Sequence, residues 1–121
     1  MDFRTQKTSE KYQKFLKKRS VGDACRFCEE TLPEGKYFFR YWKVLHNNFP
    51  YDLIAEKHDI LVPIRHFETE DEMTSEEREE LTNIKTQILP QWEEYHSAME
   101  NFITARTMSH YHIHLLKFKE L

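Results

Sequence analysis

The sequence predicts a small α+β domain in which an antiparallel sheet is covered on one face by a long helix. A segment near the end of the chain alternates apolar residues with histidines, which is typical of a strand. An aromatic and β-branched run at residues 36–46 indicates further strands, and a helical stripe of apolar residues lies between the two. The resulting order of helix, strands, long helix and strand favours the α+β class.

Length and composition are typical of one domain, so we expect residues 1–121 to fold as a unit. A chain of 121 residues can bury a core without disulfides, and its 14% of aromatic residues supply bulky side chains. No apolar run is long enough to span a membrane, and the polar start lacks a signal-peptide segment. We therefore expect a cytoplasmic protein. With 2 glycines, the glycine-rich Rossmann and P-loop nucleotide-binding motifs are excluded.

The first twenty residues are basic, with seven Lys or Arg against two acids, although the whole chain has a net charge of −3. Within residues 8–19, Tyr12, Phe15 and Leu16 follow helical spacing. This pattern predicts an amphipathic helix that docks on the body of the protein. We interpret its lysines as a solvated face, with a nucleic acid or another phosphate-rich partner as the less favoured alternative.

The next segments predict the first part of the sheet. Residues 36–46 favour one long strand, or two strands joined by a bulge. Residues 47–52 have the composition of a loop. Residues 58–63 predict a short strand that ends at Pro63.

A long helix is expected to follow, beginning at a capping box formed by Thr74 and Glu77. Its apolar stripe runs to about residue 98 and consists of Leu81, Ile84, Ile88, Trp92, Tyr95 and Met99. Pro90 should kink this helix or split it in two, because proline cannot donate a backbone hydrogen bond. Residues 101–106 then predict a third strand or the approach to the histidine strand.

The histidine strand is the most informative segment. Side chains alternate between the faces of a strand, so His110, His112 and His114 should share one face. The intervening residues should face the core: Tyr111, Ile113 and Leu115. The three histidines would span about 13 Å along a strand, too far to bind one metal ion together. We therefore favour a nucleophilic imidazole that attacks phosphorus, with His112 as the central residue.

Cys25 and Cys28 form a C-x-x-C pair, which is half of a tetrahedral zinc site. His66 and His110 are candidate partners if the sheet brings the two strand ends together. A zinc ion held in this way would be structural, because protein ligands fill all four positions. Two buried free thiols are the alternative.

Two blocks of the sequence resemble the histidine triad (HIT) family. His110–Leu116 fits the signature His-φ-His-φ-His-φ-φ, in which φ is apolar. Asn47–Tyr51 is similar to the Asn-x-x-Pro loop of the family, and His58–His66 to its motif His-φ-φ-Val-x-Pro-x-x-His. The resemblance extends from about Cys25 to Phe118, and the basic N-terminal helix lies outside it.

The resemblance implies a HIT-like antiparallel sheet, a homodimer and an enzyme that acts on nucleotides. It implies a nucleotide hydrolase or nucleotidyl transferase that forms a covalent nucleotidyl-histidine on His112. Substrates of this class include nucleoside phosphoramidates and dinucleoside polyphosphates. His114 and His58 match positions around the phosphate, Asn47 a position near the ribose hydroxyls, and Thr107 a contact to the phosphate or leaving group.

The resemblance also bears on the metal. In a zinc-containing subset of the family, and in the related hexose-1-phosphate uridylyltransferases, the ligands match Cys25, Cys28, His66 and His110. A structural Zn²⁺ is therefore implied. Residues 101–107 contain none of the glycines that many members carry there. For this reason the alternative function is a nucleotide-binding or protein-interaction module on the same scaffold without turnover.

Overall fold

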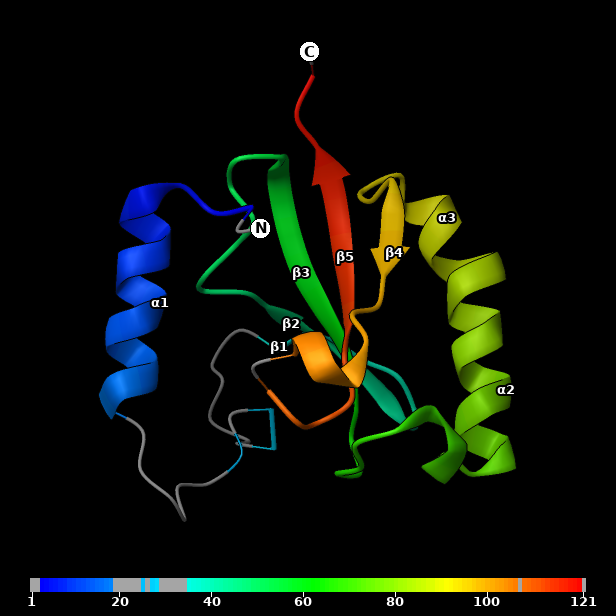
Figure 1. Cartoon of the computed structure of the whole chain (residues 1–121). Helices are drawn as coiled ribbons and strands as arrows, with labels where there is room; N and C mark the ends of the chain where they lie inside the picture. The colour runs from blue at the N-terminus through cyan, green and yellow to red at the C-terminus, as the bar shows by residue number, and fades with distance from the viewer. Residues whose placement is uncertain (1–2, 19–24, 26, 29–34, 107, 121) are drawn as a thin grey trace.

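The computed structural model describes residues 3–18, 25, 27–28, 35–106 and 108–120. The elements are α1 (Gln6–Lys18), β1 (Gly35–Phe38), β2 (Trp42–His46), β3 (Ala55–Pro63), η1 (Glu70–Glu72), α2 (Ser75–Asn83), η2 (Ile84–Ile88), α3 (Leu89–Trp92), β4 (Ser97–Met99), η3 (Ile103–Ala105) and β5 (Ile113–Phe118). The strands form one antiparallel sheet in the order β1-β2-β3-β5-β4 (Figure 1). The predicted α+β class is confirmed. No helix of the described residues is long and apolar enough to cross a membrane.

The main core lies between one face of the sheet and the helical segment α2–η2–α3. Figure 1 shows this segment alongside the sheet. Its buried side chains come from both layers: Trp42, Val44, Leu61, Ile113 and Leu115 from the strands, and Leu81, Ile84 and Leu89 from the helical segment. The long helix therefore covers one sheet face, as predicted. The opposite face carries a smaller apolar cluster of Phe27, Leu45, Ile60 and Val62.

The predicted alternation of faces near the end of the chain is confirmed. Tyr111, Ile113 and Leu115 belong to the main core, and the three histidines lie outside it. The regular strand is shorter than expected, and β5 begins only at Ile113. Its partner β3 ends at Pro63, which has no N–H to continue the ladder. The N–H of Tyr111 instead donates to Phe67, over 2.7 Å.

The helix after Thr74 ends earlier than the stripe predicts. Thr74 and Glu77 form the expected capping box. The turn before Pro90 is the π-helical η2, whose wider spacing accommodates a residue without an N–H. The helix then stops at Trp92, because Glu93 has a left-handed backbone with φ of 57°. Residues 97–99, expected to be helical, form the edge strand β4.

Two other predictions need correction. Residues 36–46 do not form one strand or two strands joined by a bulge. They form a hairpin in which β1 pairs with β2 and the N–H of Phe39 donates to the carbonyl of Trp42. For residues 101–106 the strand is wrong and the alternative, the approach to the histidine strand, is observed. This approach contains the short helix η3, because β4 already occupies the edge of the sheet beside β5.

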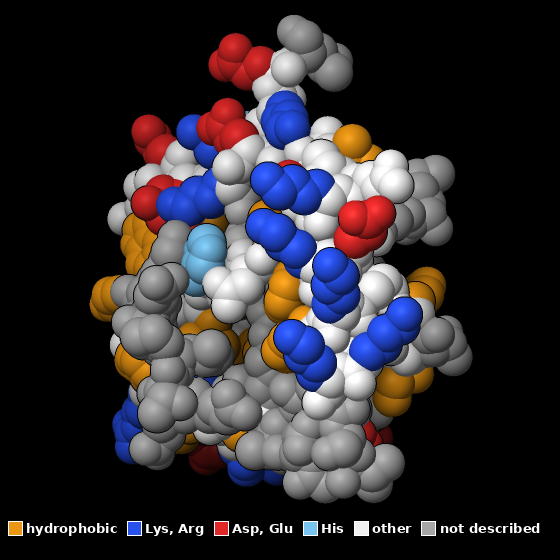
Figure 2. All heavy atoms as spheres, turned by 90° about the vertical axis from the view of Figure 1, so that its left-hand side faces the viewer, with side chains coloured by type: hydrophobic (Ala, Val, Ile, Leu, Met, Phe, Trp, Pro, Cys, Tyr) orange, Lys and Arg blue, Asp and Glu red, His pale blue; other side chains and the backbone are white. Residues whose placement is uncertain are grey.

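The N-terminal helix docks on the loop after β2, as its apolar spacing predicts. The rings of Tyr12 and Phe15 lie 5.0 and 5.1 Å from that of Phe49, centroid to centroid. Before the helix, Asp52 accepts hydrogen bonds from the N–H and hydroxyl of Thr5. Lys and Arg side chains gather on the outer face of this region (Figure 2). The predicted solvated face is observed in the exposed lysines of α1.

Candidate functional site

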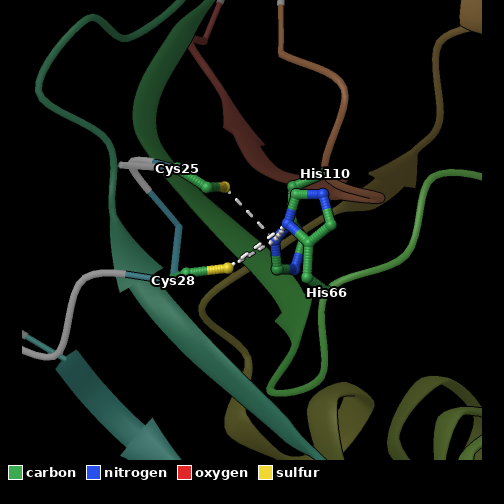
Figure 3. Close-up of side chains that lie close together, drawn as sticks. All are labelled: Cys25, Cys28, His66 and His110. Carbon is green, nitrogen blue, oxygen red and sulfur yellow. Dashed lines mark hydrogen bonds between the residues drawn. The ribbon is translucent and has the colours of Figure 1, made fainter. Parts of the chain in front are cut away.

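Two cysteines and two histidines from three separate segments converge at one end of the sheet (Figure 3). One potential ligand atom from each of Cys25, Cys28, His66 and His110 lies within 4.8 Å of the others. The Nδ1 atom of His110 is 3.4 Å from the sulfur of Cys25 and 3.3 Å from that of Cys28. The Nδ1 atom of His66 is 3.3 Å from the sulfur of Cys28 and 3.0 Å from Nδ1 of His110.

These separations fit one tetrahedral metal ion. Zinc bonds of about 2.0 to 2.3 Å place neighbouring ligand atoms about 3.3 to 3.8 Å apart. The second ring nitrogen of His110, Nε2, lies 3.0 Å from the carbonyl of Pro63, to which it donates. The lone pair of a neutral His110 is therefore on Nδ1, which faces the two sulfurs. Such an outer hydrogen bond is typical of metal-binding histidines.

The neutral state of His110 also suits a cation. Burial, followed by the neighbouring His66, lowers the pKa of His110 to about 4, so its ring is neutral near pH 7. Burial and the adjacent Cys25 raise the pKa of Cys28 to about 11. A thiol binds zinc as its thiolate, so metal binding at neutral pH would release a proton from Cys28.

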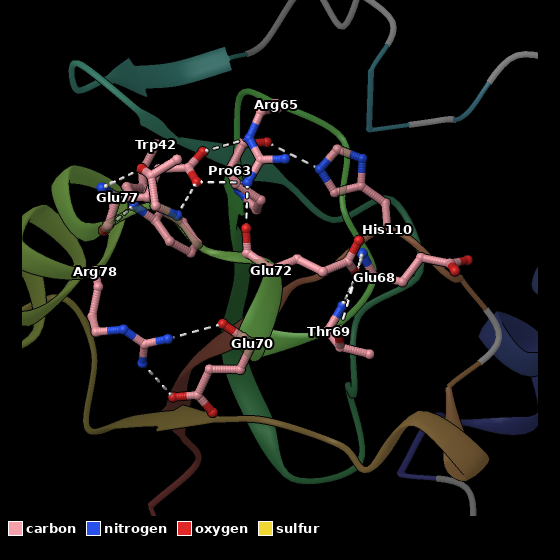
Figure 4. A network of polar contacts seen from close by, with 11 residues as sticks. Trp42, Pro63, Arg65, Glu68, Thr69, Glu70, Glu72, Glu77, Arg78 and His110 are labelled. Atoms are coloured by element: carbon pink, nitrogen blue, oxygen red, sulfur yellow. Dashed lines mark hydrogen bonds and ion pairs between the residues drawn. The ribbon is translucent and has the colours of Figure 1, made fainter.

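A polar network fixes the segment that carries His66 (Figure 4). The preceding residue, Arg65, donates two hydrogen bonds to the buried carboxylate of Glu77, over 2.8 and 3.2 Å. It also donates to the carbonyl of Glu72 over 2.7 Å. The same Glu77 accepts from the N–H of Thr74 at the start of α2. The loop after β3 is thereby attached to the covering helix, and His66 is held beside the cysteines.

His112 lies beside this cluster, at the wall of a cavity. Its Nδ1 atom is 2.8 Å from the backbone carbonyl of His110 and must donate to it, since a carbonyl only accepts. The lone pair of the neutral imidazole is therefore on Nε2. A ring oriented in this way, with one nitrogen held and the other basic, is suited to act as a nucleophile.

His114 and His58 form a buried pair on the same sheet face. Nδ1 of His58 accepts from the N–H of Tyr51 over 2.9 Å, so its proton is on Nε2. This nitrogen donates over 2.8 Å to Nδ1 of His114. The proton of a neutral His114 is then on Nε2, which faces the hydroxyl of Tyr51 at 3.4 Å. Burial, with smaller effects of His112 and Arg4, lowers the pKa of His114 to about 3.

The cavity has a volume of about 310 Å³ and lies between the sheet, the N-terminal segment and the chain around η3. Three of the predicted site residues line it: His112, His114 and Asn47. Asn47 is 3% exposed and accepts from the N–H of Phe49, which fixes the orientation of its amide. His58 lies behind His114 as its hydrogen-bond partner. Thr107 lies outside the described residues.

The cavity also has residues that the sequence did not assign to the site. Arg4 and Tyr12 come from the N-terminal segment, Tyr51 from the loop before β3, and Asn101 and Arg106 from the chain around η3. Asn101 donates to the hydroxyl of Tyr51 over 3.3 Å. Asn101 could have been assigned to the site from the sequence, because it lies shortly before the histidine signature. Nothing local in the sequence indicates that the N-terminal segment folds back over this cavity.

Solved structures of histidine triad proteins share this fold. A HIT family hydrolase from Legionella pneumophila Philadelphia 1 is 22% identical, with 80% of this chain and 95% of that chain covered and a TM-score of 0.56. A histidine triad protein from Clostridium difficile is 17% identical, with coverage of 70% and 78% and a TM-score of 0.51. A histidine triad nucleotide-binding protein from Candida albicans is 18% identical, with coverage of 80% and 76% and a TM-score of 0.54.

The sequence itself matches no family model, and the comparison with curated proteins finds no significant match. The chain thus has the fold of histidine triad proteins. Within that fold, the predicted cluster of two cysteines and two histidines is present as a group compatible with a metal ion.

Proposed function

We propose that the protein is a HIT family enzyme, a nucleotide hydrolase or nucleotidyl transferase that acts at the α-phosphate through His112. The observation that carries this proposal is the orientation of the His112 ring and its place at the cavity. Its Nδ1–H is held by the carbonyl of His110, and its ring lines the cavity. The similarity to a HIT family hydrolase and to a histidine triad nucleotide-binding protein supports a nucleotide as the substrate.

The proposed reaction has two steps. Nε2 of His112 attacks the α-phosphorus, a P–N bond forms, and the bond to the leaving group breaks with its electron pair on that group. Water or an acceptor hydroxyl then attacks the phosphorus and releases the histidine. We assign to His114 a hydrogen bond to a phosphate oxygen, donated by the Nε2–H that faces Tyr51 in the absence of substrate. Asn47 and Thr107 are assigned to the ribose and to the phosphate or leaving group.

We assign a structural zinc to Cys25, Cys28, His66 and His110. Burial of His110, its hydrogen bond to Pro63 and the gathering of the four ligand atoms within 4.8 Å of one another support this assignment. When bound, the ion would join the segment of the two cysteines to the two strand ends. It would have no place in the proposed reaction, since all four positions are filled by protein.

A trapped intermediate tests the proposal. The wild type is mixed with a nucleotide substrate labelled in the α-phosphate and quenched rapidly in alkali, in which a phosphohistidine bond survives. We expect a labelled adduct on the wild type and on His96→Gln, because His96 is exposed and outside the cavity. His112→Ala should lack the adduct and turnover. Nucleotide binding with no adduct and no turnover across phosphoramidates, dinucleoside polyphosphates and nucleotide sugars would favour the non-catalytic module.

The homodimer is part of the same proposal, since it follows from the family resemblance. Sedimentation equilibrium at micromolar concentration tests it directly, because the chain mass is 14.9 kDa. We expect a species of twice this mass. A monomer that retains activity would contradict this part of the proposal and leave the role of His112 intact.

A further inference from the structure

Two arginines from distant parts of the chain line the cavity beside His112 and His114. Arg4 precedes α1, and Arg106 follows η3. Among the described residues that line the cavity there is no Asp or Glu. A cavity with two guanidinium groups and no carboxylate attracts a ligand with more than one negative charge.

Arg4 is held in position by the fold. Its Nε donates to the carbonyl of Phe49 over 2.7 Å. Its guanidinium carbon lies 4.4 Å from the ring centroid of Tyr12 and 4.8 Å from that of Tyr51. The docking of α1 therefore places a cation over one side of the cavity, with its guanidinium group close to two aromatic rings.

Two guanidinium nitrogens of Arg106 lack a hydrogen-bond partner among the described residues. Its Nε and Nη1 atoms are buried and find no hydrogen-bond partner within the part of the chain that the structure describes. Its guanidinium carbon is 5.9 Å from the ring centroid of Tyr111. Buried donors of this kind are normally satisfied in a working protein. Both nitrogens are inaccessible from the cavity as the side chain lies. A phosphate would reach them once the side chain turns toward the cavity, where the parallel N–H groups of a guanidinium match two oxygens of one phosphate group.

We propose that Arg4 and Arg106 bind a second phosphate group, next to the α-phosphate, so that the preferred substrates contain a pyrophosphate linkage. This inference rests on the proposed function and narrows its substrate class. A phosphoramidate has one phosphate group and an amine leaving group, which gives the second cation no partner. A dinucleoside polyphosphate or a nucleotide sugar supplies the additional anion.

The chemistry of the leaving group agrees with this assignment. When Nε2 of His112 attacks, the bond between the α-phosphorus and the bridging oxygen breaks, and its electron pair stays on the departing phosphate. The two arginines stabilise this charge, so the group can leave without first taking up a proton. An amine leaving group must be protonated, and neighbouring cations disfavour its protonation.

The surroundings of Arg4 provide a path for the distal part of such a substrate. Arg4 also borders a shallow hollow along α1, whose charged lining consists of Lys14, Lys17 and one acid, Glu10. Figure 2 shows Lys and Arg side chains gathered on this face. A substrate that extends beyond its second phosphate would pass from the histidine cavity toward these lysines.

Binding measurements without turnover test the inference. Calorimetry measures the affinities of the protein for AMP and for the α,β-methylene analogue of ADP, which has a second phosphate and resists cleavage at the bridge. The same two affinities are measured for UMP and the α,β-methylene analogue of UDP. We expect the wild type to bind the diphosphate analogue at least about tenfold more tightly than the monophosphate, as expected for charge-assisted hydrogen bonds. Arg106→Gln and Arg4→Gln should reduce this ratio to less than about threefold, and Arg106→Lys should retain part of it.

Arg40→Gln is the matched control, because Arg40 is exposed and does not line the cavity; its ratio should equal that of the wild type. Thermal unfolding confirms that each variant is folded. An unchanged ratio in a folded Arg106→Gln, or equal wild-type affinities for the two nucleotides, would overturn the inference.

The two proposals fail in distinguishable ways. A preference for the diphosphate analogue in a protein that forms no adduct would contradict catalysis and support the second-phosphate site. A labelled adduct that forms with equal kcat/KM from phosphoramidates and dinucleoside polyphosphates would support catalysis and contradict the site.

Discussion

The backbone carbonyl of His110 accepts a hydrogen bond from Nδ1 of His112 over 2.8 Å. The side chain of His110 belongs to the cysteine–histidine cluster, and its backbone orients the candidate nucleophile. One residue therefore connects the two sites. Any disturbance of the cluster that moves the backbone of His110 should also change the orientation of the His112 ring.

Loss of the metal should weaken both stability and activity. The purified protein is expected to contain about one zinc per chain, and Cys25→Ser should reduce this content and lower Tm. At neutral pH, adding zinc to the metal-free protein should release protons, because the pKa of Cys28 is raised to about 11. Metal analysis and a pH-indicator titration measure both effects. A substoichiometric metal content with a freely titratable Cys25 would contradict the site.

Stability should depend on pH through His114. Its pKa is about 3 in the folded protein and near its ordinary value of 6.5 in the unfolded chain, so the unfolded state binds the proton first as pH falls. The free energy of unfolding should therefore decrease below pH 6.5, by about 1.4 kcal/mol per pH unit from this group. Urea denaturation between pH 7 and pH 5 measures the slope. His114→Asn should remove this part of it.

The comparison needs two controls, one for the metal and one for the loss of a histidine. His110 also has a lowered pKa and should contribute a slope of the same sign in metal-free protein. The measurements are therefore made with and without zinc. His96→Gln, at an exposed position, is the control for the loss of a histidine as such. An identical slope in His114→Asn and the wild type would contradict the buried, neutral state of His114.

The N-terminal segment should detach when Asp52 loses its charge. Burial alone would raise the pKa of Asp52, but hydrogen bonds from Thr8 and Thr5 outweigh it and lower the pKa. The stabilisation from docking is thus present above the ordinary pKa of about 4 and is lost as pH falls through the lowered value. Asp52→Asn should weaken docking by about 1 kcal/mol.

Limited proteolysis followed by mass spectrometry checks this expectation. Cleavage within residues 3–18 should accelerate in Asp52→Asn, and the affinity for the diphosphate analogue should fall because Arg4 is no longer held over the cavity. Glu79→Gln, an exposed carboxylate on α2, is the control. Unchanged cleavage would show that the aromatic contacts of Tyr12 and Phe15 are sufficient for docking.

Substitution of Glu77 should destabilise the protein and weaken metal binding together. Glu77→Gln removes the charge that binds Arg65 and weakens the cap of α2 at Thr74. The expected cost is about 2 kcal/mol, since Glu77 is buried and Arg65 is half exposed. Urea denaturation and zinc competition measure the two effects. Glu76→Gln, with an exposed side chain, should change neither.

Where the sequence prediction was wrong, the deciding interaction was not local. The apolar stripe of the long helix continues past Trp92, but strand pairing with β5 places residues 97–99 in the sheet. Residues 101–106 have the composition of a strand, yet the edge beside β5 is already occupied. In both places a short apolar pattern is compatible with two structures, and pairing in the tertiary fold selects one.

The sequence by itself determined the class of fold and the sheet face that the three histidines share. Alternation of apolar and histidine residues assigns a sheet face, because the side-chain period of a strand is fixed. Only the tertiary structure decided what each histidine contacts. It places His110 with the cysteines, holds His112 through a backbone carbonyl and joins His114 to His58. It also brings Arg4 and Arg106, about a hundred positions apart in the chain, to one cavity, because docking of the N-terminal helix depends on contacts with distant residues.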